Sequence, residues 1–261
     1  MENIKQTHHY GSQFNLINNI YLENQLTRLC LPETKQPEVN RLVKKLYLGL
    51  IEAVVNRCFP REIQLYKTRM SEAHPKALLT AQSFNQTTKA VTVNLARAGT
   101  YPSHLCYEFL HDVLPADNFR QDHIFAARAT DESQKVTGTF LGCYKIGGSV
   151  KNSFVIFPDP MGATGGTLTS AIDHYEKNIE GPAQSYIAIH LIVTPEYLKK
   201  VLNHSKKIQV FALRVDRGLS PEEILKSPLG LNWDQEKGLN EKQYIVPGAG
   251  GLGELLNNSY V

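Results

Sequence analysis

Apolar residues recur at helical spacing between residues 37 and 59 of the chain. The positions concerned are Val39, Leu42, Val43, Leu46, Leu50 and Val54. They fall on one face, which predicts an amphipathic helix that ends near Pro60, because proline cannot continue a helix. A second helix is expected over Ser103 to Val113. An apolar helix face needs a partner surface, so residues 1–60 are expected to form a helical segment packed on the rest of the protein.

Five short apolar runs predict strands. They cover residues 89–96, 123–127, 153–157, 186–193 and 208–213. Helical stretches separate several of them, so we expect an α/β fold, in which helices flank a parallel sheet. The histidine in the fourth run, His190, is expected to be hydrogen-bonded within the sheet. Polar residues follow the runs, and the carboxyl ends of parallel strands are where open α/β folds bind ligands.

Composition narrows the class of protein. The chain has 261 residues, of which 42% are hydrophobic, and a net charge of +3. This suits one α/β domain with an appended segment, and the small charge indicates no nucleic-acid surface. No apolar run approaches the ~20 residues that span a bilayer, and the polar N-terminus lacks the apolar core of a secretion signal. We therefore expect a cytoplasmic protein without a membrane partner. The four cysteines are widely spaced, which favours free thiols over a zinc site or disulfides.

The loop over residues 159–167 has the composition of a phosphate site. An apolar strand leads into Asp159, then into small residues, and then into a helix. Unpaired N–H groups at a helix start attract anions, and glycine lets a phosphate approach closely. Thr164 and Thr167 add hydroxyls, and the Asp159 carboxylate can accept hydrogen bonds from two ribose hydroxyls. The pattern indicates a sugar-phosphate site, although an ordinary connection between a strand and a helix would share its glycines.

Two arginines follow other predicted strands. Arg97 precedes Ala98 and Gly99, a small-residue turn whose amides could face a pyrophosphate. Its planar guanidinium suits that role, because it makes bidentate contacts with phosphate oxygens. Arg128 follows the run over 123–127 and precedes acidic residues. Taken alone, either arginine would equally suit a residue that closes a strand or forms a surface ion pair.

Glycines are concentrated between Gly248 and Gly253, near the C-terminus. Their spacing satisfies Gly-x-Gly-x-x-Gly, the fingerprint of a dinucleotide site. That site also requires a following helix within a βαβ unit of about 30 residues. Only eight residues follow Gly253, which excludes such a unit. We interpret these glycines as a turn of a binding segment.

Together these motifs resemble the uracil phosphoribosyltransferases, which are type I phosphoribosyltransferases. The resemblance rests on Asp-Pro-Met-x-Ala-Thr-Gly-Gly-Thr at 159–167, on Arg-Ala-Gly at 97–99 and on the uracil-binding segment at 237–248. Matches run in family order from about Asn15 to Glu254. The resemblance implies one type I phosphoribosyltransferase-like domain over 1–261. It would consist of the N-terminal helical segment (1–60), a core (61–213) and a base-binding hood (214–261). The core would bind phosphoribosyl pyrophosphate (PRPP).

The resemblance also implies roles for single residues. The catalytic set would be Asp159, on the ribose hydroxyls, with Arg97 and Arg128 on the pyrophosphate. PRPP would be bound by Arg97, Ala98, Gly99, Arg128, Asp159, Pro160, Met161, Gly162, Ala163, Thr164, Gly165, Gly166 and Thr167. The base would be bound by Tyr244, Ile245, Gly250, Gly251 and Leu252. No residue would ligate a metal directly, because Mg²⁺ would arrive with PRPP. The implied reaction joins uracil to PRPP, giving UMP and pyrophosphate, in a homodimer or larger homo-oligomer with GTP as a candidate effector.

The chain departs from the family pattern on the base side. Gly251 stands where the uracil enzymes have an aspartate near PRPP and its magnesium, and Leu255 replaces a basic residue. Residues 220–233 are extra relative to a compact member. Alternatives therefore stay open, namely a phosphoribosyltransferase for another base, a PRPP- or nucleotide-binding regulatory protein without catalysis, and a structural α/β domain without a phosphate site.

Overall fold

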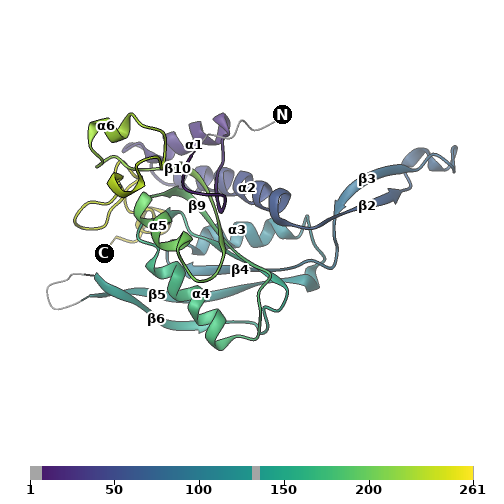
Figure 1. Cartoon of the computed structure of the whole chain (residues 1–261). Coiled ribbons are helices and arrows are strands. Elements are labelled where there is room, and N and C mark those ends of the chain that lie inside the picture. Colours follow the sequence, from purple (N-terminus) through teal and green to yellow (C-terminus); the bar gives the residue numbers. More distant parts are fainter. Residues whose placement is uncertain (1–7, 131–135, 261) are drawn as a thin grey trace.

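A mostly parallel sheet lies at the centre of the computed structural model, which describes residues 8–130 and 136–260. The strands lie in the order β1-β10-β9-β7-β4-β5-β6, and the short β8 pairs with β9. Only β6 is antiparallel to its neighbour within this described sheet. The strands are β1 (Phe14–Leu16), β4 (Lys89–Ala96), β5 (Phe119–Thr130), β6 (Val136–Lys145), β7 (Ser153–Pro158), β8 (Met161–Gly162), β9 (Ser185–Val193) and β10 (Ile208–Val215). The expected α/β fold is confirmed (Figure 1).

Helices pack on both faces of this sheet. One face carries α1 (Ile20–Cys30), α2 (Glu38–Cys58) and α3 (Thr100–Leu110), and the other carries α4 (Gly166–Asn178) and α5 (Pro195–Leu202). Successive side chains of a strand point to opposite faces. In β7, Phe154 and Ile156 therefore join the core under α2, whereas Val155 and Phe157 join the core under α4. Burial on both faces explains why the central strands are continuous apolar runs.

The predicted elements agree with the structure except at their ends. The α2 helix covers the predicted amphipathic stretch, and its apolar stripe is fully buried. The α3 helix begins at Thr100 rather than Ser103. The strand expected over 123–127 extends to Thr130, so Arg128 lies within β5, opposite Thr139 of β6, and not in a following loop. Pairing with β6 continues β5 beyond Phe125, where its ladder with β4 ends.

A separate two-stranded sheet projects from the body of the protein, as Figure 1 shows. It consists of β2 (Arg61–Tyr66) and β3 (Leu79–Phe84), paired antiparallel, with the 3₁₀ helix Arg69–Ser71 between them. We refer to this element as the arm. Ile63 and Leu65 are 71% and 65% exposed, so the arm adds little to either core. The arm has no counterpart among the elements predicted from the sequence, because no buried apolar run marks its strands.

Residues 220–236 form a compact loop within the hood. This loop contains α6 (Glu222–Leu225) and the 3₁₀ helix Trp233–Gln235. The ends of this loop meet, since the amide of Leu219 donates to the carbonyl of Lys237 at 3.0 Å. Inside the loop, the buried Glu236 carboxylate accepts hydrogen bonds from Arg217 at 2.5 Å and from a backbone amide. A buried charge of this kind needs such partners. The last described helix, α7 (Leu252–Asn257), lies near the C-terminal end of the hood.

Candidate active site

The loop over residues 159–167 lies at the carboxyl end of β7, as predicted. The Asp159 carboxylate accepts a hydrogen bond from the amide of Met161 at 3.1 Å, which orients it. Helix α4 then begins at Gly166. Gly165, which precedes it, has a φ of 77°, a left-handed conformation that favours glycine. Glycine has no side chain to cap the helix. The amide of Gly166 makes a long hydrogen bond, 3.5 Å, to the Thr164 hydroxyl, and the next N–H groups of the first turn are available to an anion.

The end of β9 and the start of α5 support this loop from beneath. The hydroxyl of Thr194 donates to the carbonyl of Ala163 at 2.6 Å, and its amide donates to the carbonyl of Gly162 at 3.0 Å. A Cβ atom on Gly162 would lie 2.8 Å from Val193 and 3.2 Å from the ring of Tyr197. The phosphate loop is therefore packed tightly against the end of β9 and the start of α5, which fix its shape.

The turn after β4 packs against the same edge of the sheet. A Cβ atom on Gly99 would lie 2.8 Å from the Leu95 carbonyl and 3.0 Å from the Pro158 carbonyl, so only glycine allows this approach. The guanidinium of Arg97 is exposed and donates to the carbonyl and the hydroxyl of Ser259, at 3.3 and 3.2 Å. Arg97, the residue predicted to bind pyrophosphate, is thus in contact with the C-terminal residues. The side chain of Arg128 lies outside the described part of the chain.

The hood is held to the sheet by an ion pair after β10. The Arg214 guanidinium binds the Asp216 carboxylate at 2.6 Å and the carbonyl of Gly248 at 3.2 Å. The same carboxylate accepts the amide of Gly248 at 2.7 Å. Glu196, in the first turn of α5, accepts hydrogen bonds from two further hood amides, one of them that of Gly238 at 3.0 Å. The backbone of the hood is therefore fixed by two carboxylates from the carboxyl edge of the sheet.

The phosphate loop, the turn after β4 and the hood enclose one cleft of about 260 Å³. The predicted residues that line it are Ala98, Asp159, Met161, Ala163, Thr164, Gly165, Thr167, Tyr244, Ile245, Gly250, Gly251 and Leu252. Arg97, Gly99, Pro160, Gly162 and Gly166 were also predicted but are not among its lining residues. The cleft brings residues separated by more than 80 positions to one place, which strengthens the interpretation of the loop as a binding site.

The lining also includes residues that the sequence analysis did not assign to the site. These are Leu95, Phe157, Leu168, His190, Tyr197, Gln243 and Gly253. His190 was expected to be hydrogen-bonded in the sheet, and it does form two hydrogen bonds. Its partners are the Asp159 carbonyl, 2.6 Å from Nδ1, and the Tyr197 hydroxyl, 2.5 Å from Nε2. His190 thus lies between Asp159, at the end of the neighbouring strand, and Tyr197 of α5. Only the fold reveals this placement.

Burial shifts the pKa values of Asp159 and His190, which both line the cleft, in opposite directions. It raises the pKa of the Asp159 carboxyl to about 6, although the Met161 amide opposes the shift. It lowers the pKa of His190 to about 4, although the hydrogen bond to the Asp159 carbonyl opposes that shift. At neutral pH the carboxyl is therefore ionised and the imidazole is neutral.

Gly251 stands at the position of the aspartate of the uracil enzymes, and the space beside it is occupied. A Cβ atom at this position would lie 2.5 Å from Oε2 of Glu254, one helical turn further on. The carboxylate of Glu254 thus lies beside the backbone of Gly251, which itself lines the cleft. Replacing Gly251 by a larger residue would displace Glu254.

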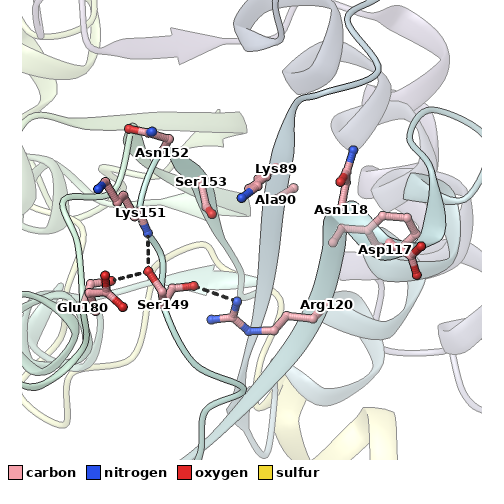
Figure 2. Close-up of a pocket in the computed structure, with 11 residues that line it drawn as sticks. Lys89, Ala90, Asp117, Asn118, Arg120, Ser149, Lys151, Asn152, Ser153 and Glu180 are labelled. Atoms are coloured by element: carbon pink, nitrogen blue, oxygen red, sulfur yellow. Dashed lines mark hydrogen bonds between the residues drawn. The ribbon is translucent and has the colours of Figure 1, made fainter.

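A second pocket, of about 390 Å³, lies at the opposite edge of the sheet (Figure 2). It is lined by residues at the amino ends of β4, β5 and β7, including Lys89, Arg120 and Ser153. The guanidinium of Arg120 is already bound to Asp122 at 2.9 Å and to the carbonyl of Ser149 at 2.9 Å. Open α/β sheets bind their ligands at the carboxyl ends of strands, so the first cleft is the candidate active site.

Comparison with known proteins identifies the family. A family model described as uracil phosphoribosyltransferase matches residues 16–230. The chain belongs to the uracil phosphoribosyltransferase family. The fold is accordingly that of the type I phosphoribosyltransferases, as the sequence predicted.

Relatives within the family are distant. The uracil phosphoribosyltransferase of Aquifex aeolicus is 32% identical over 107 residues, which are 41% of this chain and 40% of that protein. The matched segment is thus about two fifths of the length of that relative. The enzyme of Brucella anthropi is 27% identical over 235 residues, which are 90% of this chain and 93% of that protein.

A solved structure supports the same fold over nearly the whole chain. The AQ2163 protein from Aquifex aeolicus superposes with a TM-score of 0.70 at 20% sequence identity, covering 95% of this chain and 99% of the other. Within the described residues, no helix combines the length and apolar character needed to cross a membrane.

Proposed function

We propose that this member of the family transfers the phosphoribosyl group from PRPP to uracil, with release of pyrophosphate and formation of UMP. The observation that carries the proposal is the single cleft in which the phosphate loop faces the hood backbone. A phosphoribosyl donor and a planar base must meet in one such space, with the base nitrogen held close to the anomeric carbon.

The residues of the cleft suit the separate parts of PRPP. The open N–H groups at the start of α4 would bind the 5-phosphate, and Thr164 and Thr167 would add hydroxyl donors. The ionised Asp159 would accept hydrogen bonds from the two ribose hydroxyls. Arg97 and Arg128 would stabilise the negative charge that develops on the leaving pyrophosphate. Contact with pyrophosphate requires Arg97 to leave Ser259, its present partner.

The hood would recognise uracil through its main chain. Uracil presents an acceptor, a donor and a second acceptor along one edge, and a rigid backbone can match this order with carbonyl and amide groups. The carboxylates of Asp216 and Glu196 hold that backbone in place. Ile245, Gly250 and Leu252 would supply the contacts, with Tyr244 and Gly251 beside them. Closure of the cleft around the two substrates would exclude water that could hydrolyse PRPP.

The donor groups of the cleft fit a metal that comes with PRPP. Across residues 8–130 and 136–260, no three or more His, Cys, Asp or Glu side chains form a group that could hold a metal ion. Mg²⁺ is commonly held by substrate phosphates, water and one or two carboxylates, and Glu254 beside Gly251 is a carboxylate at the cleft edge. Bound in this way, the ion would neutralise charge on the pyrophosphate.

The proposal is tested by measuring UMP formation from uracil and PRPP in the presence of Mg²⁺. We expect turnover with the unaltered protein and its loss in Asp159→Asn, which removes the charge that orients the ribose. Asp117→Asn is the matched control, because Asp117 is exposed and lies away from the cleft. No turnover with uracil, together with turnover on another base, would assign the protein to that base instead.

Two observations favour a second function, that of a regulatory protein that binds PRPP or nucleotides without catalysis. Gly251 carries no carboxylate, and Arg97 is in contact with the C-terminal residues. Thermal-shift titrations with PRPP, UMP, uracil and GTP separate the two functions. Stabilisation by these ligands without turnover supports regulation, whereas stabilisation by UMP together with turnover supports the enzyme.

A further inference from the structure

The corner at which β7 leaves the sheet has an unusual hydrogen-bond pattern. The amide of Asp159 still donates to the carbonyl of Ile189 on β9, at 3.0 Å. In a regular parallel ladder the amide of Leu191 would then donate to the Asp159 carbonyl. It donates instead to the carbonyl of Pro160, at 3.0 Å. The Asp159 carbonyl has therefore lost its strand partner, although a buried carbonyl needs a donor.

His190 supplies that donor from its side chain. Its Nδ1 lies 2.6 Å from the Asp159 carbonyl oxygen, which can only accept, so Nδ1 carries the proton. In the neutral ring Nε2 is then an acceptor, and it receives the hydroxyl of Tyr197 at 2.5 Å. Both side chains are 2% exposed, and burial keeps the imidazole neutral by lowering its pKa. The tautomer of His190 is thus fixed by a partner on each side.

Tyr197 also connects this pair to the phosphate loop. Its ring would lie 3.2 Å from a Cβ atom on Gly162 and 3.5 Å from one on Gly165, so the loop rests on the ring. Its amide donates to Thr194, which holds the carbonyl of Ala163. One buried path therefore runs from the backbone of Asp159 through His190 and Tyr197 to the loop.

We propose that His190, held by Tyr197, is a positioning residue that fixes the distance between the Asp159 carboxylate and the phosphate loop. The inference rests on the proposed function, because that distance matters only for a ligand that spans both places. PRPP and ribose 5-phosphate carry ribose hydroxyls and a 5-phosphate at a separation set by one sugar. Inorganic phosphate engages the loop alone. A small displacement of the corner should therefore weaken the first two ligands and spare the third.

Three variants separate this role from a merely structural one. His190→Leu removes both hydrogen bonds. His190→Asn keeps a donor at the position of Nδ1, because the asparagine Nδ2 atom lies at the same point along the side chain. Tyr197→Phe keeps the ring under the loop but removes the hydroxyl that fixes the tautomer. Each variant is assayed for binding of ribose 5-phosphate, PRPP and inorganic phosphate by calorimetry or ligand-observed NMR, and for KM of PRPP and of the base.

For His190→Leu we expect affinity for ribose 5-phosphate and PRPP to fall by about 10- to 100-fold. Affinity for inorganic phosphate and KM for the base should change less than about threefold. His190→Asn should recover most of the loss. Tyr197→Phe should show a smaller loss of the same kind, and it provides the test if His190→Leu does not fold.

Equal weakening of ribose 5-phosphate and inorganic phosphate would overturn the positioning role, because a general loss of structure would act on both. Unchanged ribose 5-phosphate binding in His190→Leu would overturn it as well. Failure of the proposed function would look different. In that case the unaltered protein itself would form no UMP from uracil and PRPP, whether or not it binds ribose 5-phosphate.

Discussion

Replacing Asp159 by asparagine should make the protein more stable at neutral pH while removing its activity. The Asp159 carboxyl has a pKa of about 6 in the folded protein because it is buried, against an ordinary value of 3.8. The ionised form is thus disfavoured by folding. The resulting destabilisation is absent below the unfolded pKa, grows as the pH rises from about 4 to 6, and is complete above the folded pKa.

The size of the effect follows from the two pKa values. Their difference corresponds to about 3 kcal/mol, since one pKa unit is about 1.4 kcal/mol. The side chain borders an open cleft, so solvent screening reduces the figure to about 1–2 kcal/mol. Asparagine can still accept the Met161 amide and carries no charge. For a chain of this length, such a gain raises Tm by roughly 2–4 °C at pH 8.

Thermal unfolding followed by circular dichroism at pH 8 and at pH 4 measures the difference directly. We expect Asp159→Asn to exceed the unaltered protein in Tm at pH 8 and to match it at pH 4. Asp117→Asn, at an exposed site, should change neither value. A variant that is less stable at pH 8, or equally stabilised at both pH values, would show that burial of the charge is not what raises this pKa.

Three further predictions concern the candidate site and the loop over residues 220–236. First, kcat/KM for PRPP at saturating uracil should fall about tenfold per pH unit below pH 6, because the Asp159 carboxylate then takes up a proton. A flat profile between pH 5 and 8 would contradict the ribose-binding role of Asp159. Second, deleting residues 258–261 frees Arg97 and should tighten pyrophosphate binding about two- to fivefold in calorimetry; unchanged affinity would show that this contact does not compete. Third, Glu236→Gln leaves Arg217 buried without its countercharge and should lower the free energy of unfolding in urea by about 3–5 kcal/mol. The exposed control Glu222→Gln should leave it almost unchanged, and an equal effect of the two variants would refute the role of the buried ion pair.

The sequence predicted those parts of the fold in which burial and local chemistry act together. Strands β4, β7, β9 and β10 are buried on both faces, so continuous apolar runs revealed them. The phosphate loop was also predictable, because an anion site at a helix start requires small residues in a fixed local order. Local patterns of this kind need no knowledge of distant neighbours.

Contacts between distant segments could not be predicted in this way. Tyr197 lies beneath the phosphate loop because β9 and α5 are adjacent to it in space. The arm was missed for the opposite reason, since its apolar side chains are exposed and leave no pattern of burial. The role of Arg128 stays a prediction, carried by its place in the family motif.

The loop over residues 220–236 enters and leaves the protein at one point, where Leu219 and Lys237 are hydrogen-bonded. A segment whose ends touch can change length without changing the path of the chain on either side. This loop is therefore a natural place at which to insert a reporter domain, because the rest of the hood, the carboxylates that hold it and the cleft would keep their positions. A deletion, by contrast, would have to keep Glu236, the buried countercharge of Arg217.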